Sequence, residues 1–245
     1  MARLLVYDRY IDRVYTYSSV NENDAMPYST QSTLLLREFR GESGSPTLWT
    51  TTDAMEAWNL TRRRYGRGIH VGYAFRRIWE GGHGTRSQHY AGVAFDVGQT
   101  TTAEHRKEIF NAALRTGAWG YVEPLSLTPT WVHFDRRYGV AACSGTTSGY
   151  PTVRRGSRGC YVMVLQDALS TLGYPTGEKI DGVFGPLTET ALKGYQSRNW
   201  LTVDGICGCN SWSKISTAVL GVGRDRKSTR LNSSHNNQSR MPSSA

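Results

Sequence analysis

Three stretches of the chain repeat apolar residues at helical spacing. The first covers residues 54–65 and ends at Gly66, and the second covers residues 103–116 and ends at Gly117. Threonines that can cap a helix precede both, and a glycine after the last apolar position is a common stop signal. The third stretch carries its apolar positions at Val162, Leu165, Leu169 and Leu172. The pattern therefore predicts helices in both halves of the chain.

Shorter stretches alternate apolar and polar residues, which is typical of half-buried strands. Two lie near the start, at residues 4–7 and 13–17, a third covers residues 69–75, and a fourth covers residues 131–134. Mixed with the first two helices, the third and fourth of these strands indicate a compact α+β region that begins near Leu34. We can assign no chemistry to the segment before it.

Changes in composition divide the chain into regions. Residues 143–151 are small, polar and glycine-rich, which is typical of a linker. We therefore expect an unassigned N-terminal extension, an α+β domain, a linker, a small all-α domain and a disordered tail, at residues 1–33, 34–142, 143–151, 152–220 and 221–245.

The all-α region contains an internal echo. Asp181-Gly182 and Asp204-Gly205 each form a predicted tight turn, and a hydroxyl or amide residue that can cap a helix follows each turn. Three short helices joined by two such turns account for the region of about 70 residues.

The tail has an unusual sequence. Residues 225–235 and 238–245 resemble the in-frame translation of a common sequencing adapter, although a natural basic, disordered tail has a similar composition. We leave the tail out of the fold prediction. It carries +4 of the formal net charge of +9, so the body of the protein is mildly basic. Such a body suits an anionic partner such as a bacterial wall, but it lacks the clustered basic stripe of a nucleic-acid binder.

Compartment signals are few. No apolar run approaches the roughly 20 residues needed to cross a bilayer, and the first apolar run, before Asp8, is too short for a signal peptide. Four cysteines permit three pairings, of which a bridge between Cys160 and Cys209 would tie the start of the helical domain to its end. The alternative is four reduced thiols.

Three residues in two short motifs can hold one metal ion. In strands, residues two apart face the same side, so Ala94 shares a face with Asp96, and Trp131 shares a face with His133. Two neighbouring strands would then aim Asp96 and His133 at one point, while His89 enters from the preceding loop. Two imidazoles and one carboxylate suit zinc and leave a position open for water, as in a catalytic site.

These motifs make a family resemblance visible. Ser87, His89, Gly92, Ala94 and Asp96 stand at the fixed positions of the pattern SxHxxGxAxD. With Trp131 and His133 in a closing strand, residues 34–142 resemble the zinc D-Ala-D-Ala carboxypeptidases and L-Ala-D-Glu peptidases of bacterial cell walls. The resemblance implies a hedgehog-type α+β fold with a small antiparallel sheet. It also implies that His89, Asp96 and His133 bind Zn²⁺ and that Ser87 supports the loop.

The catalytic base is ambiguous. Many members of the resembled family carry a carboxylate three residues before the last histidine, where this chain has Thr130. Glu123 and Asp135 are the two candidates to replace it, and Asp135 can instead orient a ligand. We favour Glu123.

The catalytic cation is ambiguous too. Arg76 follows an aromatic residue in the strand before the motif, where the resembled family carries an arginine, and Arg86 is its competitor. The histidines that fit no ligand spacing are interpreted as structural, and these are His70, His83 and His105.

A second resemblance covers residues 152–220. The spacing of Gly159, Val162, Leu165 and Gln166, followed by the two Asp-Gly turns and Trp212, is similar to the three-helix peptidoglycan-binding module. Most of these positions determine the fold, and they locate no ligand groove. Both resemblances imply one partner, bacterial peptidoglycan.

The combined expectation is a zinc metallopeptidase that cuts stem peptides in or near the cell wall. It would be monomeric, bind neither nucleic acid nor membrane, and be released without a signal peptide, with a phage origin as one option. A linked wall-binding module would raise the effective substrate concentration. The alternative is a weak or inactive wall-binding protein that keeps zinc for structure.

Overall fold

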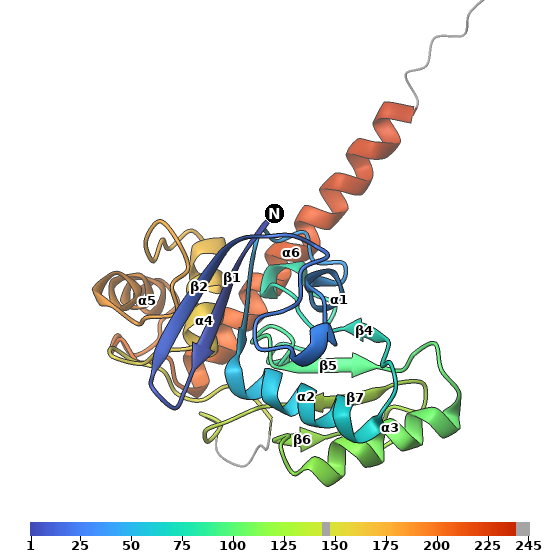
Figure 1. The fold of residues 1–245 in the computed structure, drawn as a ribbon. Helices are drawn as coiled ribbons and strands as arrows, with labels where there is room; N and C mark the ends of the chain where they lie inside the picture. Colours follow the sequence, from blue (N-terminus) through green and yellow to red (C-terminus); the bar gives the residue numbers. More distant parts are fainter. Residues whose placement is uncertain (144–147, 239–245) are drawn as a thin grey trace, which may run out of the picture.

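The computed structural model describes residues 1–143 and 148–238, with side chains up to Gly223 (Figure 1). Two small sheets and six α-helices make up its regular structure. The first sheet has the order β2-β1-β3, in which β1 pairs antiparallel with β2 and parallel with β3. These strands cover Ala2–Asp8, Arg13–Val20 and Thr47–Thr51.

The first 33 residues are therefore not a separate extension, and this prediction was wrong. Strand β1 is buried along almost its whole length because it lies between β2 and β3. Its central residues Leu4, Leu5 and Val6 are fully buried. The two strands were visible in the sequence, but β3, the second partner of β1, lies some 40 residues further along the chain.

Helices α2 (Thr52–Tyr65) and α3 (Ala103–Thr116) form where the capping signals predict. Thr51 accepts a hydrogen bond from the Ala54 amide at the start of α2, and Thr102 does the same for His105 at the start of α3. Each helix ends at a glycine in the left-handed region. The short helix α1 covers Leu36–Arg40.

A small antiparallel sheet carries the motifs, as expected for this region. Its order is β4-β5-β7-β6, and α2 and α3 lie beside it (Figure 1). The strands cover Val71–Tyr73, Ala94–Val97, Val132–Asp135 and Tyr121–Val122 in that order. Strand β4 is shorter than the alternation in residues 69–75 predicts, and the short helix η2 (Ile78–Glu80) follows it.

The C-terminal region folds into the three predicted helices α4, α5 and α6, at Cys160–Thr171, Pro186–Arg198 and Cys209–Gln238. A buried glutamine supports each Asp-Gly turn. The side-chain amide of Gln166 donates to Asp181 Oδ1, and its carbonyl accepts from the Gly182 amide. Gln196 makes the same two bonds to Asp204 and Gly205.

The α+β region and the helical region share one hydrophobic core, which corrects the expectation of two domains joined by a linker. Buried side chains from both form a single cluster that includes Trp49, Phe95, Leu165 and Trp212. A buried ion pair crosses the boundary. The guanidinium of Arg77, just before η2, donates hydrogen bonds to both carboxylate oxygens of Asp167 on α4. The distance from Nε to Oδ2 is 2.7 Å.

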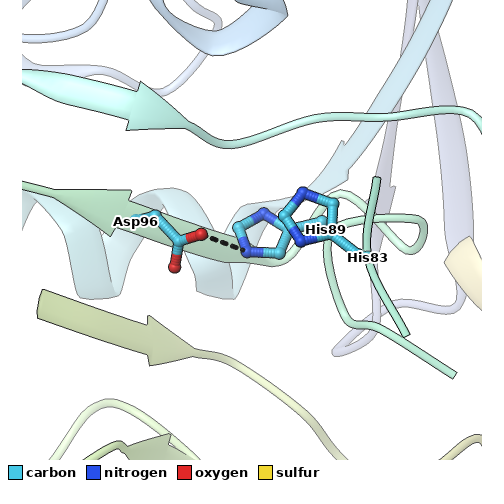
Figure 2. Close-up of side chains that lie close together, drawn as sticks. All are labelled: His83, His89 and Asp96. Atoms are coloured by element: carbon cyan, nitrogen blue, oxygen red, sulfur yellow. Dashed lines mark ion pairs between the residues drawn. The ribbon is translucent and has the colours of Figure 1, made fainter. Parts of the chain in front are cut away.

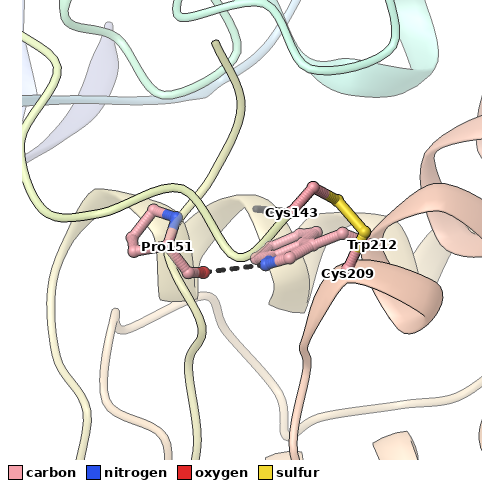
Figure 3. The surroundings of a disulfide bond; sticks show 4 residues. All are labelled: Cys143, Pro151, Cys209 and Trp212. Atoms are coloured by element: carbon pink, nitrogen blue, oxygen red, sulfur yellow. Dashed lines mark hydrogen bonds between the residues drawn. A yellow bond between two sulfur atoms is a disulfide. The ribbon is translucent and has the colours of Figure 1, made fainter. Parts of the chain in front are cut away.

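The segment predicted as a linker is also part of this interface (Figure 3). Tyr150 is buried, and its ring lies 4.9 Å from that of Trp212, whose indole donates to Pro151 O. A disulfide joins Cys143 to Cys209. Residues 144–147 of the expected linker lie outside the described part.

The bridge between Cys160 and Cys209 that the sequence analysis considered does not form. Cys160 is buried at the start of α4, and its thiol contacts the hydroxyl of Tyr138. The fold instead brings residue 143 within 4.7 Å of residue 209, measured between Cα atoms. This approach reflects the docking of the two regions, which cysteine spacing does not encode.

The tail differs from the disordered segment that we expected from residue 221. The backbone continues α6 to Gln238, and residues 239–245 lie outside the described range. Helix propagation adds one hydrogen bond for each residue fixed, so a packed first half can extend into a polar second half.

Candidate metal centre

The register of β5 against β7 places Asp96 directly opposite His133. Paired residues in antiparallel strands project from the same face, so the two side chains meet. His133 Nδ1 lies 2.7 Å from Asp96 Oδ1. On the other face, Phe95 and Phe134 pack in the core with ring centres 6.0 Å apart. The strand pattern predicted this division between a polar and an apolar face.

His89 reaches the same point from the loop before β5. Gly92 has a φ of +69°, and a Cβ there would lie 1.9 Å from Trp49 O, so only glycine permits this close approach. The Ser87 hydroxyl accepts a hydrogen bond from the His89 amide at 3.3 Å. His89 Nε2 then lies 3.2 Å from Asp96 Oδ2 (Figure 2).

The hydrogen-bond roles at His89 favour a cation at this point. Its Nδ1 lies 3.0 Å from Ala74 O, which can only accept, so Nδ1 carries the proton. In the neutral ring, Nε2 is then a lone pair that faces a carboxylate oxygen, and it is buried without a hydrogen-bond partner among the described residues. Two electron pairs facing each other in a buried site are stabilised by a cation that both can bind.

The ring geometry fits one ion held by His89 and His133. Their ring centres lie 5.4 Å apart, with 62° between the planes. Two imidazoles that share one tetrahedral zinc through bonds of about 2 Å have ring centres roughly 5 Å apart. Asp96 thus lies between the two histidines, with Oδ2 facing His89 Nε2 and Oδ1 facing His133 Nδ1, and the three residues have donor types that suit zinc.

His83 lies beside this set, although sequence spacing marked it as structural. One oxygen of Asp96 and one nitrogen each of His83 and His89 lie within 4.8 Å of one another. However, the His83 ring stacks on the His89 ring, with centres 4.2 Å apart and 19° between planes (Figure 2). Because an imidazole binds a metal in its own plane, two stacked rings cannot both face one ion. His83 therefore packs against His89 and is not a member of the candidate donor set.

Several pKa shifts follow from this crowding. Burial, and then His89, lower the pKa of His83 to about 3, so its ring is neutral. Burial by itself would raise the pKa of the Asp96 carboxyl, but the hydrogen bond from His133 and the electrostatic influence of the adjacent His89 and His133 rings hold this pKa well below its usual range. Burial disfavours the charged form of His133, yet Asp135 and Asp96 raise its pKa to about 9.

Asp135 has no oxygen left for a reaction. It is fully buried, and its Oδ1 accepts from the amide and Nε of Arg137 at 3.0 and 2.7 Å. Its Oδ2 faces His133 Nε2 at 3.2 Å and also binds Arg137. A carboxylate behind a ligating histidine fixes the ring and raises its basicity. The geometry thus suits Asp135 to orienting His133.

Glu123 directly follows β6, which is an edge strand of the sheet. Its amide donates to His133 O at 2.9 Å, in continuation of the β6–β7 ladder. The register therefore pairs Glu123 with His133 and puts their side chains on one face. Its side chain is half-buried and makes no hydrogen bond or ion pair with any described residue. The strand ladder thus leaves Glu123 available for proton transfer.

Both candidate arginines line cavities beside the donor set. Arg76 lines one together with Tyr73, His83 and Asp96, and its guanidinium also binds Glu42 at 2.8 Å. Arg86 lines a second cavity with His133, Asp135 and Arg137. Sequence reasoning missed Arg137. Its only signal was a basic residue two positions after a candidate carboxylate.

Comparison with known proteins identifies part of the chain. Residues 158–215 match the model of the family described as "Putative peptidoglycan binding domain". These residues form a peptidoglycan-binding domain. The match covers helices α4 and α5 and the first turns of α6.

Individual relatives are cell-wall proteins. The chain is 40% identical over 79 residues to the zinc D-Ala-D-Ala carboxypeptidase of Streptomyces albus G, which covers 31% of this chain and 30% of that protein. It is 42% identical over 59 residues to the spore cortex-lytic enzyme of Bacillus cereus, covering 24% and 22%. The chain thus matches less than a third of the length of either relative.

Among solved structures, the SleB N-terminal domain is similar at 35% identity. The match covers 28% of this chain and 92% of the SleB domain, with a TM-score of 0.27. No described helix is both long and apolar enough to cross a membrane.

Proposed function

We propose that this chain is a zinc-dependent peptidase that hydrolyses an amide bond in the stem peptides of peptidoglycan. The helical domain would hold it on the cell wall, so we place its action at the wall or outside the cell. The bond is a terminal D-Ala–D-Ala, an L-Ala–D-Glu or a cross-bridge linkage.

One observation carries this proposal. The buried Nε2 of His89 faces Asp96 Oδ2 at 3.2 Å without a proton between them in the neutral ring, and His133 completes the set. A bound zinc ion would lower the pKa of a coordinated water and polarise the scissile carbonyl.

The chain's own residues supply the remaining chemistry. Glu123, paired with His133 on the exposed face, would take a proton from water and deliver it to the leaving amine. Asp135 would keep His133 oriented through Nε2. Arg76 and Arg86, on separate cavities beside the site, would bind a substrate carboxylate or the developing oxyanion.

Digestion of defined muropeptides, followed by mass spectrometry, tests this proposal and identifies the bond. We expect about one zinc per chain by elemental analysis and release of a new amine. His89→Ala should lose both. His105→Ala, a surface histidine that contacts Arg67 and Thr101, should keep both. Cleavage by His89→Ala, or by chelated protein, would rule out the zinc mechanism.

The same experiment separates a second candidate function. A wall-binding protein that keeps zinc for structure would contain the metal and bind peptidoglycan but cleave no muropeptide. Full occupation of Asp135 by Arg137 and His133 favours this candidate only if Glu123 also fails to act as base.

A further inference from the structure

Trp200 is the one exposed tryptophan of the seven in the chain, all of which lie in the described part. Its side chain is 92% exposed, whereas Trp49, Trp58 and Trp212 are fully buried. It makes no hydrogen bond, ring contact or cation contact with any described residue. Tryptophan is highly buried on average and carries a large apolar surface, so an indole that is 92% exposed is unusual.

The backbone at Trp200 is also in an unfavourable conformation. Its φ is +52°, in the left-handed region where a bulky side chain is an outlier. It stands just after α5, where the Leu201 amide donates to Gln196 O and the Trp200 amide to Ser197 O. This is the hydrogen-bonded helix end at which glycine is the common residue.

Helix α4, in the first copy of the internal echo, ends in the same way but has glycine at the equivalent position. After α4, the Tyr174 amide donates to Leu169 O and the Gly173 amide to Ser170 O, and Gly173 has a φ of +85°. A Cβ at Gly173 would meet nothing within 4 Å, so glycine is used there for its backbone freedom alone. Trp200 therefore occupies a glycine position in the second copy.

Neither packing nor backbone preference accounts for Trp200, because its backbone is strained and its side chain is exposed. Strained residues persist where the surroundings fix them, and they gather at ligand-binding sites. Trp200 thus has the physical character of a ligand contact rather than of a fold determinant.

The residues next to Trp200 define the chemistry of that ligand. Leu201 and Thr202, the two residues after Trp200, line a hollow. Asp204 and Asn210 also line it. The Thr202 and Asn210 side chains are exposed and make no hydrogen bond with any described residue. An exposed indole directly before the chain segment that lines a hollow with a free hydroxyl and a free amide suits an uncharged ring that is apolar on one face and carries hydroxyl and acetamido groups at its rim.

We propose that Trp200 and this hollow bind the glycan strand of peptidoglycan, with an N-acetylhexosamine ring stacked on the indole. This site rests on the wall-binding part of the proposed function and is independent of the metal centre. The helical domain would then recognise sugar, while the metal centre acts on peptide.

Binding by the full-length, chelator-treated protein tests the proposal without interference from hydrolysis. The probes are a tetramer of N-acetylglucosamine, followed by calorimetry, and intact sacculi, followed by co-sedimentation. Trp200→Gly should weaken binding to both roughly tenfold or more, as removal of a central aromatic contact does. Because glycine relieves the backbone strain, its melting temperature should stay equal or rise. Trp200→Phe should keep most of the affinity.

Leu187→Ala is the matched control, because Leu187 is 62% exposed at the other end of the same helix. It should bind as the wild type does. Equal binding by wild type and Trp200→Gly, or no binding of the tetramer by wild type, would overturn the glycan site. Failure of wild type on sacculi as well would overturn wall binding itself. Dimerisation that Trp200→Gly abolishes would assign the indole to a second copy and overturn the proposal.

Discussion

Tyr161, on the first helix of the peptidoglycan-binding domain, donates a buried hydrogen bond of 3.0 Å to the side-chain carbonyl of Gln88. Gln88 directly precedes His89, and its amide donates to Gly149 O at 2.9 Å. The Tyr150 hydroxyl also donates to Ser87 O. The helical domain and the segment before it therefore hold the loop that carries a candidate zinc ligand, which a flexibly tethered module would not do.

Tyr161→Phe should weaken zinc binding although residue 161 touches no proposed ligand. Removing the hydroxyl leaves Gln88 Oε1 buried without that donor, which costs about 1–3 kcal/mol of stability and loosens the loop. Competition with a chromophoric chelator measures the affinity, and urea unfolding measures the stability. Tyr174→Phe is the control, because no described residue hydrogen-bonds that hydroxyl. An unchanged zinc affinity in Tyr161→Phe would show that the contact supports only the fold.

Glu123→Gln and Asp135→Asn should fail in different ways. Glu123→Gln should keep zinc and stability but lose about 100-fold or more in kcat, because an amide cannot take the proton. Asp135→Asn should lose about 3 kcal/mol of stability and bind zinc more weakly, since it breaks a buried pair with Arg137. Single-turnover kinetics and zinc titration distinguish them. Full activity in Glu123→Gln would assign the base elsewhere.

Zinc binding should become tighter as the pH rises towards 9. In the metal-free protein, Asp135 and Asp96 raise the pKa of His133 from 6.5 to about 9, so the ion must displace a proton. A raised histidine pKa stabilises the metal-free fold fully below pH 6.5, and this contribution is lost as the pH passes through about 9. Thermal melts of chelated and zinc-loaded protein across pH 6–10 should therefore diverge. A constant difference in melting temperature would contradict this coupling.

Breaking the Arg77–Asp167 pair should destabilise the whole chain rather than one domain. Arg77→Met leaves the nearly buried Asp167 carboxylate without its cation, at a cost of about 3 kcal/mol. Since both regions share one core, unfolding should remain a single transition by both fluorescence and circular dichroism. Arg155→Ala, which breaks an exposed pair with Glu189, should change little. Two separate transitions in Arg77→Met would show that the regions fold independently.

Local patterns predicted much of the fold. The capped helices ending at Gly66 and Gly117 formed as expected, because capping hydrogen bonds and left-handed glycines act within one turn. The strand alternation placed Asp96 and His133 on one face, because side-chain direction along a strand has a period of two. These features depend on a few neighbouring residues, so one sequence suffices to find them.

Long-range contacts could not be predicted from such local patterns. The pairing of β1 with β3, the Cys143–Cys209 bridge and the stacking of His83 on His89 each join segments through the way larger units dock. Docking depends on the fit of whole surfaces, which periodicity does not encode. For the same reason, the sequence left both Glu123 and Asp135 as candidate bases, with Glu123 favoured, and the contacts of Arg137 with Asp135 became visible only in the folded structure.

By itself, the sequence marked His89, Asp96 and His133 as candidate zinc ligands, because strand geometry puts Asp96 and His133 on one face and these residue types suit zinc. It also determined the helical domain, whose turns and apolar spacing are local. Tertiary structure alone decided that this domain packs into the core of the region that carries these candidates and holds the loop before His89 through Tyr161. The physical reason is that burial of a shared apolar surface is settled between distant segments, after each has formed its own helices and strands.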